Sequence, residues 1–148
     1  MLIGIDPALS PDVLHALAAM GHGDEIVVAD ANFPAASVAA STTVGEPLRM
    51  DVPTPRAVEA ILSLLPLDTF VPAPVARMAV VDDPHAVPDV QREVDAVLHR
   101  TGAPGTVESV ERHAFYERAA RAFAVVRTGE RRFYGCVILV KGVIGPDG

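Results

Sequence analysis

The chain has 148 residues, a net charge of −7, an apolar content of 50% and a single cysteine. This length suits one domain with one sizeable core, while the acidic charge argues against a nucleic-acid partner, which favours basic surfaces. No apolar run approaches the roughly 18 residues that a membrane span requires, and one cysteine excludes an intramolecular disulfide.

The high apolar content of so short a chain indicates that part of its surface is buried against copies of itself. The first residues lack the basic segment and the long apolar segment of a signal peptide, which favours a cytoplasmic location. We therefore expect a cytoplasmic homo-oligomer built from a single domain that covers residues 1–148.

The predicted secondary structure alternates between helices and short β-rich runs. In chain order we expect a helix over 11–20, a strand over 26–29, a loop over 31–37, a helix over 54–65, a strand over 78–81, a turn over 83–88, a helix over 89–100, a strand over 106–110, a helix over 111–121, and strands over 123–126 and 134–140. Ser10 and Gly21 supply the cap and the stop of the first helix. The last two strands, joined by a turn at 128–130, predict an antiparallel hairpin. The pattern predicts an α/β fold with a mixed, mostly parallel sheet.

His22 lies between two glycines in the turn after the first predicted helix. Imidazoles exchange protons near neutral pH, and glycines let a ligand approach closely, so His22 is a candidate general acid/base. Asp30 follows the first strand, at the edge of an α/β sheet where ligands usually bind. Each residue also has a structural explanation, as an exposed histidine in a capping turn and as the side chain of an Asx-turn. Spacing alone leaves both interpretations open.

Two further segments carry side chains suited to binding a sugar. Arg112 and Tyr116 lie four residues apart and share one face of the helix predicted over 111–121. Arginine offers a rigid set of donors, and aromatic faces pack on sugar C–H groups. Tyr134 and Cys136 open the last predicted strand around a glycine that either lets a ligand approach or marks a bulge. A solvated helix face and an inert buried thiol are the structural alternatives.

The histidines and the cysteine do not form a metal-binding motif, and no glycine-rich nucleotide-binding loop is present in the sequence. We therefore expect neither a metal nor a cofactor.

The segment from His22 to Ala35, HGDEIVVADANFPA, resembles the signature of the ribose pyranase and fucose mutarotase family (RbsD/FucU). Further matches lie at 5–7, 9–11, 14–21, 134–135 and 141–143. Residues 115–119, 123–126 and 128–130 are similar to the fucose branch in particular. The resemblance covers nearly the whole chain.

This resemblance implies a three-layer α/β/α sandwich and an isomerase that interconverts the α and β anomers of a free monosaccharide, L-fucose in this branch, without cofactor or metal. His22 would be the catalytic acid/base, and Asp30 would orient the sugar or the imidazole. The resemblance implies that Asp30, Arg112 and the segment of Tyr134 contact the sugar. With Tyr116 on the same helix face as Arg112, the expected substrate-binding residues are Asp30, Arg112, Tyr116, Tyr134 and Cys136. Members of the family typically assemble into rings, often decamers, with sites near subunit contacts.

Two positions depart from the fucose branch. Cys136 stands where asparagine is common, and Ala36 stands where a histidine is often found. At Cys136 one hydrogen bond to a sugar hydroxyl is lost or replaced by water, which bears on sugar preference more than on the reaction. Two alternatives remain beside a fucose mutarotase: a D-ribose pyranase, and a sugar-binding oligomer without catalysis.

Overall fold

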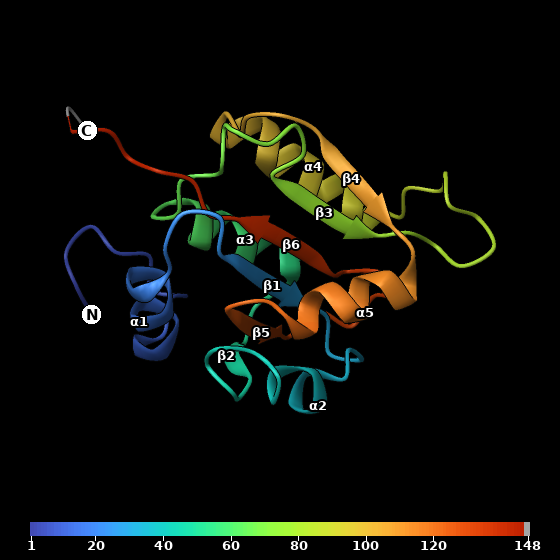
Figure 1. Ribbon diagram of the computed structural model, residues 1–148, viewed down its shortest axis with the longest axis horizontal. Coiled ribbons are helices and arrows are strands. Elements are labelled where there is room, and N and C mark those ends of the chain that lie inside the picture. Colours follow the sequence, from blue (N-terminus) through green and yellow to red (C-terminus); the bar gives the residue numbers. More distant parts are fainter. Residues whose placement is uncertain (147–148) are drawn as a thin grey trace.

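The computed structural model describes residues 1–146 and arranges them around one six-stranded sheet (Figure 1). The strands are β1 (Glu25–Ala29), β2 (Leu48–Met50), β3 (Val75–Met78), β4 (Val107–Val110), β5 (Ala124–Thr128) and β6 (Val137–Val140). The helices are α1 (Pro11–Ala19), α2 (Ala35–Ala39), α3 (Thr54–Leu62), α4 (Asp89–Thr101) and α5 (Arg112–Ala120).

The sheet is mixed, with the strand order β2-β5-β1-β6-β3-β4. β5 pairs in parallel with β1 and β2, and β3 pairs in parallel with β4. β6 runs antiparallel between β1 and β3. The prediction of a mixed, mostly parallel sheet is therefore confirmed.

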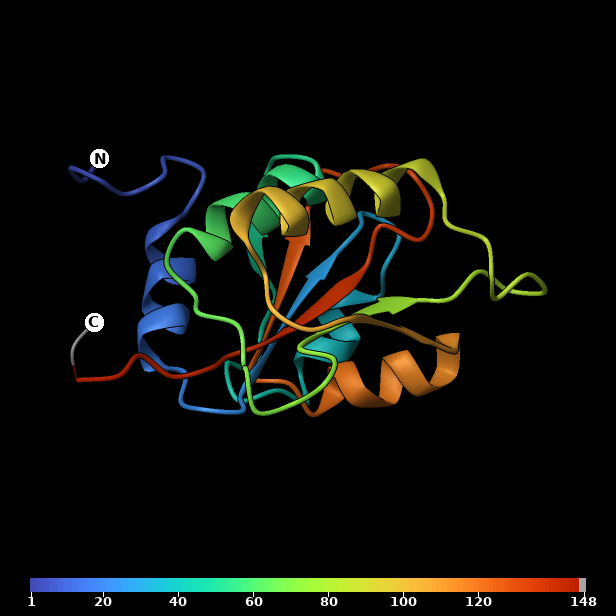
Figure 2. The same cartoon turned by 90° about the horizontal axis from the view of Figure 1, so that it is seen from above.

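Helices cover both faces of the sheet, as Figure 2 shows for α3 and α4 on one side and α5 on the other. Side chains alternate along β1, so Ile26 and Val28 pack in one core and Val27 and Ala29 in the other. The first core takes its helical side chains from α1, α3 and α4, and the second takes Phe115 and its neighbours from α5 and α2. The expected three-layer α/β/α sandwich is confirmed.

The hairpin predicted for the last two strands is wrong, because β1 lies between β5 and β6. Val27 pairs with Val125 on one side and with Ile138 on the other. β1 is buried on both faces and needs a neighbour at each edge, and this requirement outweighs the short connection between β5 and β6. The loop over 129–136 therefore crosses the carboxyl end of β1.

Several other boundaries differ from the prediction. The strand expected over 78–81 lies at Val75–Met78, and the residues after it turn at Asp82, which has a φ of 64°. β6 begins at Val137 instead of Tyr134, so the tyrosine lies in the preceding loop. The loop expected over 31–37 ends in the short helix α2, and the three-residue strand β2 is too short to show periodicity.

The remaining elements agree with the prediction to within a few residues. The Ser10 side chain accepts a hydrogen bond from the N–H of Val13 at 3.3 Å and caps α1 as expected. α3 stops at Leu62, three residues before the predicted end. Over residues 1–146, no helix combines the length and the apolar character needed to cross a membrane.

Candidate functional site

A pocket of about 320 Å³ lies at the carboxyl ends of β1 and β3, where the antiparallel strand β6 begins. The start of α5 and the loop between β5 and β6 complete its wall. The lining residues are Asp30, Asn32, Phe33, Met78, Arg112, Tyr116, Phe133, Tyr134 and Cys136. Five of the six site residues predicted from the sequence therefore meet in one pocket, although they are spread over a hundred residues of chain.

The Asp30 carboxylate is held rigidly in this lining, and only 5% of the residue is exposed. Its Oδ1 accepts hydrogen bonds from the backbone N–H groups of Asn32 (2.9 Å) and Phe33 (3.1 Å), which form an Asx-turn. Its Oδ2 accepts a hydrogen bond from the thiol of Cys136 at 3.3 Å. The structural explanation of Asp30 is thus confirmed, and the same turn keeps the carboxylate in the pocket lining.

The Cys136 thiol is buried beside that carboxylate, with 1% of the residue exposed. Burial raises its pKa well above the usual value, and the neighbouring charge of Asp30 raises it further, because both groups would be negative. The thiol is therefore protonated at neutral pH. It serves as a packing group and a weak hydrogen-bond donor, which agrees with the structural alternative of an inert buried thiol.

Arg112 and Tyr116 line the pocket from the first turns of α5, as their spacing predicted. The Glu111 side chain caps this helix by accepting hydrogen bonds from the N–H groups of residues 113 and 114, which hold its pKa below the usual value. The ring of Tyr116 packs edge-on against Phe33, with 5.4 Å between centroids. Arg112 is exposed at the pocket, so its donors are open to a ligand.

Tyr134 lines the pocket from a strained backbone conformation, with a φ of 63°. Its hydroxyl oxygen accepts a hydrogen bond from the N–H of Val81 at 3.2 Å. The next residue, Gly135, is packed so closely that a Cβ atom would lie 2.8 Å from Cγ of Glu130. The carbonyl of Gly135 accepts a hydrogen bond from the hydroxyl of Thr54 at 2.7 Å. The Tyr134 hydroxyl and the glycine after it are therefore both held by specific contacts.

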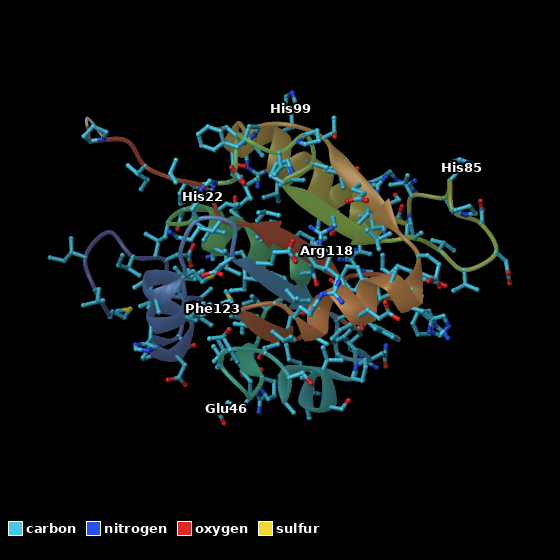
Figure 3. The ribbon with its side chains drawn as sticks, in the orientation of Figure 1. His22, Glu46, His85, His99, Arg118 and Phe123 are labelled. Atoms are coloured by element: carbon cyan, nitrogen blue, oxygen red, sulfur yellow. The ribbon has the colours of Figure 1, made fainter. Side chains whose placement is uncertain are left out.

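His22 lies at the other end of β1, in the connection that leads into the strand (Figure 3). Its Nε2 is 3.2 Å from Oδ1 of Asp68, and its ring is 5.4 Å from that of Phe70. β1 has five residues, which at about 3.3 Å each separate its ends by roughly 16 Å. Within one chain the structure therefore brings His22 neither to the pocket nor to Asp30, and the carboxylate that orients its imidazole is Asp68.

Asp68 and Phe70 were not predicted from the sequence. Asp68 is 3% exposed, and its Oδ1 also accepts the N–H of Phe70 at 2.9 Å. This hydrogen bond, followed by the interaction with His22, holds the Asp68 pKa below its usual value, so the carboxylate is ionised at neutral pH. Both residues lie between α3 and β3, in a segment without periodicity, so no local pattern marks them.

Other lining residues were also missed for physical reasons. Met78 and Phe33 are apolar, so their sequence pattern indicates core residues. Phe133 follows a run of charged residues that is typical of a solvated turn. Within residues 1–146 no three His, Cys, Asp or Glu side chains are grouped so as to hold a metal ion.

A mixed α/β/α sandwich with polar and aromatic side chains converging at its strand ends defines the class of small-ligand-binding α/β proteins. Within this class the chain belongs to the RbsD / FucU transport protein family, whose model matches residues 3–144. It is similar to the human fucose mutarotase, with 47% identity over 147 residues that cover 97% of this chain and 94% of the relative.

Two solved structures show the same likeness in three dimensions. One is a putative sugar-binding protein, with 52% identity and a TM-score of 0.94 over 98% of this chain and 97% of the other. The second is the fucose mutarotase of Streptococcus pneumoniae in complex with L-fucose, with 38% identity and a TM-score of 0.87 over 97% and 100% of the two chains.

Proposed function

We propose that this protein is a fucose mutarotase, which interconverts the α and β anomers of L-fucose by opening and closing the sugar ring. The observation that carries the proposal is the pocket in which Asp30, Arg112, Tyr116 and Tyr134 converge, in a chain so similar to fucose mutarotases. The chain acts as a single-domain subunit over residues 1–148, in the cytoplasm.

The reaction moves protons and leaves oxidation states unchanged. A base removes the proton from O1 while an acid delivers a proton to the ring oxygen, so the hemiacetal opens to an aldehyde. Rotation about the C1–C2 bond presents the other face of the carbonyl, and the reverse proton transfers close the ring. A positioned histidine that gives and takes these protons contributes roughly 10²–10⁴-fold to the rate.

We assign the proton transfers to His22, and its contacts define the tautomer. An ionised carboxylate only accepts hydrogen bonds, so Oδ1 of Asp68 pairs with a protonated Nε2 of His22. The other ring nitrogen, Nδ1, then carries the lone pair that accepts a proton from the sugar. The His22 side chain is 46% exposed, which leaves it accessible to a ligand from outside its own chain.

We infer that a second copy of the chain brings this histidine to the pocket, because β1 holds the two apart within one chain. Exposed aromatic rings flank both places: Phe70, 73% exposed, packs on His22, and Phe133, 72% exposed, lines the pocket. A contact that joins these two different surfaces is heterologous, and repeated rotation closes such contacts into a ring. The sugar would lie at each subunit contact, between Asp30 of one copy and His22 of the next.

Exchange NMR of the anomeric protons tests the proposal, with L-fucose and D-ribose as substrates. We expect the wild-type protein to accelerate exchange of L-fucose, His22→Ala to lose about 10²–10⁴-fold of that acceleration, and the control His99→Ala, on the exposed side of α4, to keep it. No acceleration by folded protein would overturn the proposal. Calorimetric binding without acceleration would identify a non-catalytic sugar-binding oligomer, and a preference for pyran–furan exchange of D-ribose would identify a ribose pyranase.

A further inference from the structure

Gln91 is a buried polar side chain that joins two walls of the pocket without lining it. It lies in the first turn of α4 and is 2% exposed. Its Nε2 donates one hydrogen bond to the carbonyl of Met78 at 2.8 Å and another to the carbonyl of Tyr134 at 3.1 Å. Met78 ends β3, Tyr134 lies in the loop before β6, and both line the pocket. One amide therefore ties the loop to the sheet.

The two acceptors fix the orientation of this amide. Carbonyl oxygens only accept hydrogen bonds, so the nitrogen of Gln91 has to face them. Its Oε1 is left buried, with no hydrogen-bond partner among the described residues. An unpaired buried oxygen is unfavourable. The favourable contribution of this side chain therefore comes from the two hydrogen bonds that it donates to the pocket walls.

Tyr134 needs such a restraint because its backbone is strained. A tyrosine at a φ of 63° relaxes to a negative φ unless its surroundings prevent it, and this relaxation swings both the carbonyl and the ring. The carbonyl is held by Gln91, and the hydroxyl oxygen is held by the N–H of Val81. Without the amide, the carbonyl of Tyr134 would lose its hydrogen bond, and the ring would depend on its packing against the second core and on the hydroxyl contact in an exposed segment.

We propose that Gln91 is a positioning residue for sugar recognition, which keeps Tyr134 in its left-handed conformation and its ring in the pocket wall. The inference rests on the proposed function, because it takes this pocket as the sugar site. Gln91 is buried and does not line the pocket, so a sugar bound there would not contact it. Its loss is therefore expected to weaken binding of L-fucose while leaving the proton-transfer steps, assigned to His22, nearly unchanged.

The test compares Gln91→Met with Val94→Ala. Methionine keeps the length of the side chain and removes both donors and the orphaned oxygen. Val94 is buried one turn further along α4, packs in the core and does not line the pocket, so its truncation lowers stability alone. For Gln91→Met we expect the KM for L-fucose to rise about tenfold, as for the loss of a buried hydrogen bond, with kcat within about threefold of the wild type. For Val94→Ala we expect both to stay at wild-type values.

A spectroscopic reading accompanies the kinetics. The chain has two tyrosines and no tryptophan, and both tyrosines line the pocket, so the near-ultraviolet circular dichroism of tyrosine reports on this wall. We expect that signal to fall in Gln91→Met and to persist in Val94→Ala. Gln91→Asn, which keeps an amide but is too short to bridge both carbonyls, gives the same comparison if Gln91→Met does not fold.

The outcomes separate the two proposals. A wild-type KM and tyrosine signal in folded Gln91→Met, or equal changes in Val94→Ala, would overturn the positioning role while the mutarotase assignment stands. A wild-type protein that neither binds L-fucose nor accelerates its anomer exchange would overturn the assignment and the positioning role with it.

Discussion

If each site combines His22 of one subunit with the pocket of the next, two impaired variants should restore activity when they assemble together. His22→Ala removes the proposed acid/base and leaves its own pocket intact. Arg112→Ala removes an exposed pocket residue and leaves its own His22 intact. Alone, the first should lose about 10²–10⁴-fold in rate, and the second about 10–100-fold through a lost charge-assisted hydrogen bond.

The expected recovery follows from the geometry of β1, which holds His22 and the pocket apart within one chain, so that the proposed site takes its two halves from different copies. In an equal mixture, a site is intact when two conditions hold. Its histidine has to come from an Arg112→Ala subunit, which keeps His22, and its pocket has to come from a His22→Ala subunit, which keeps Arg112. Each condition holds with a probability of about one half in a randomly assembled ring, so about a quarter of the sites are intact. The mixture should show about a quarter of the wild-type rate.

The assay is exchange NMR of L-fucose with variants that are co-refolded from denaturant, so that subunits mix before assembly. The control combines the same variants after each has assembled alone, and we expect no recovery before subunits exchange. A co-refolded mixture no faster than the mean of its two components, with mixed assembly verified by mass, would refute the shared site. His22 and the pocket would then have to meet within one chain.

Three further predictions concern the frame around the pocket. Thr54→Val should lower the free energy of unfolding by about 1–3 kcal/mol in urea denaturation, because it leaves the buried carbonyl of Gly135 without its donor. Cys136 should not react with a thiol reagent at pH 8 in the folded protein and should react fully in denaturant, because burial raises its pKa and keeps it protonated. Glu130 is buried, and its hydrogen bonds with Arg132 hold its pKa below the usual value. Its stabilising contribution is therefore complete above about pH 4.3, the ordinary pKa of glutamate, and is lost as the pH falls through the lowered value, so the stability difference between wild type and Glu130→Gln should shrink on acidification.

Each of these predictions has a matched control or a contrary result. Thr43→Val, at an exposed threonine, should change stability by less than about 0.5 kcal/mol, and an equally small change in Thr54→Val would contradict the buried role. Labelling of native Cys136 at the rate of a free thiol would show that the pocket lining opens. A constant difference between wild type and Glu130→Gln from pH 6 to pH 3 would show that this carboxylate titrates at the same pH in the folded and unfolded chain.

Local patterns predicted the elements whose apolar residues recur at helical or strand spacing. α4 and its apolar face, the cap of α1 and the buried run of β1 all belong to this kind. The position of β6 could not be predicted this way, because it depends on which strand occupies each edge of β1, and this is decided by packing between distant segments. Proximity in sequence favoured the hairpin, and the burial of β1 on both faces excluded it.

In the candidate site, too, local features could be predicted and contacts between distant segments could not. The spacing of Arg112 and Tyr116 placed them together on one helix, and the glycine-flanked His22 stood out by itself. The partnership of His22 with Asp68 joins residues 46 positions apart, through a segment that carries no motif. The separation of His22 from the pocket could have been predicted, because His22 precedes and Asp30 follows the same five-residue strand.

In the shared site that we propose, the placement of the two halves at opposite ends of β1 also links catalysis to protein concentration. A single copy would then have both halves and no complete site. An open row of n copies has one site fewer than it has subunits, and only closure of the ring completes the last one. Activity per subunit should therefore fall on dilution below the concentration at which the ring assembles. Such an enzyme would be switched off by dissociation alone, without any effector.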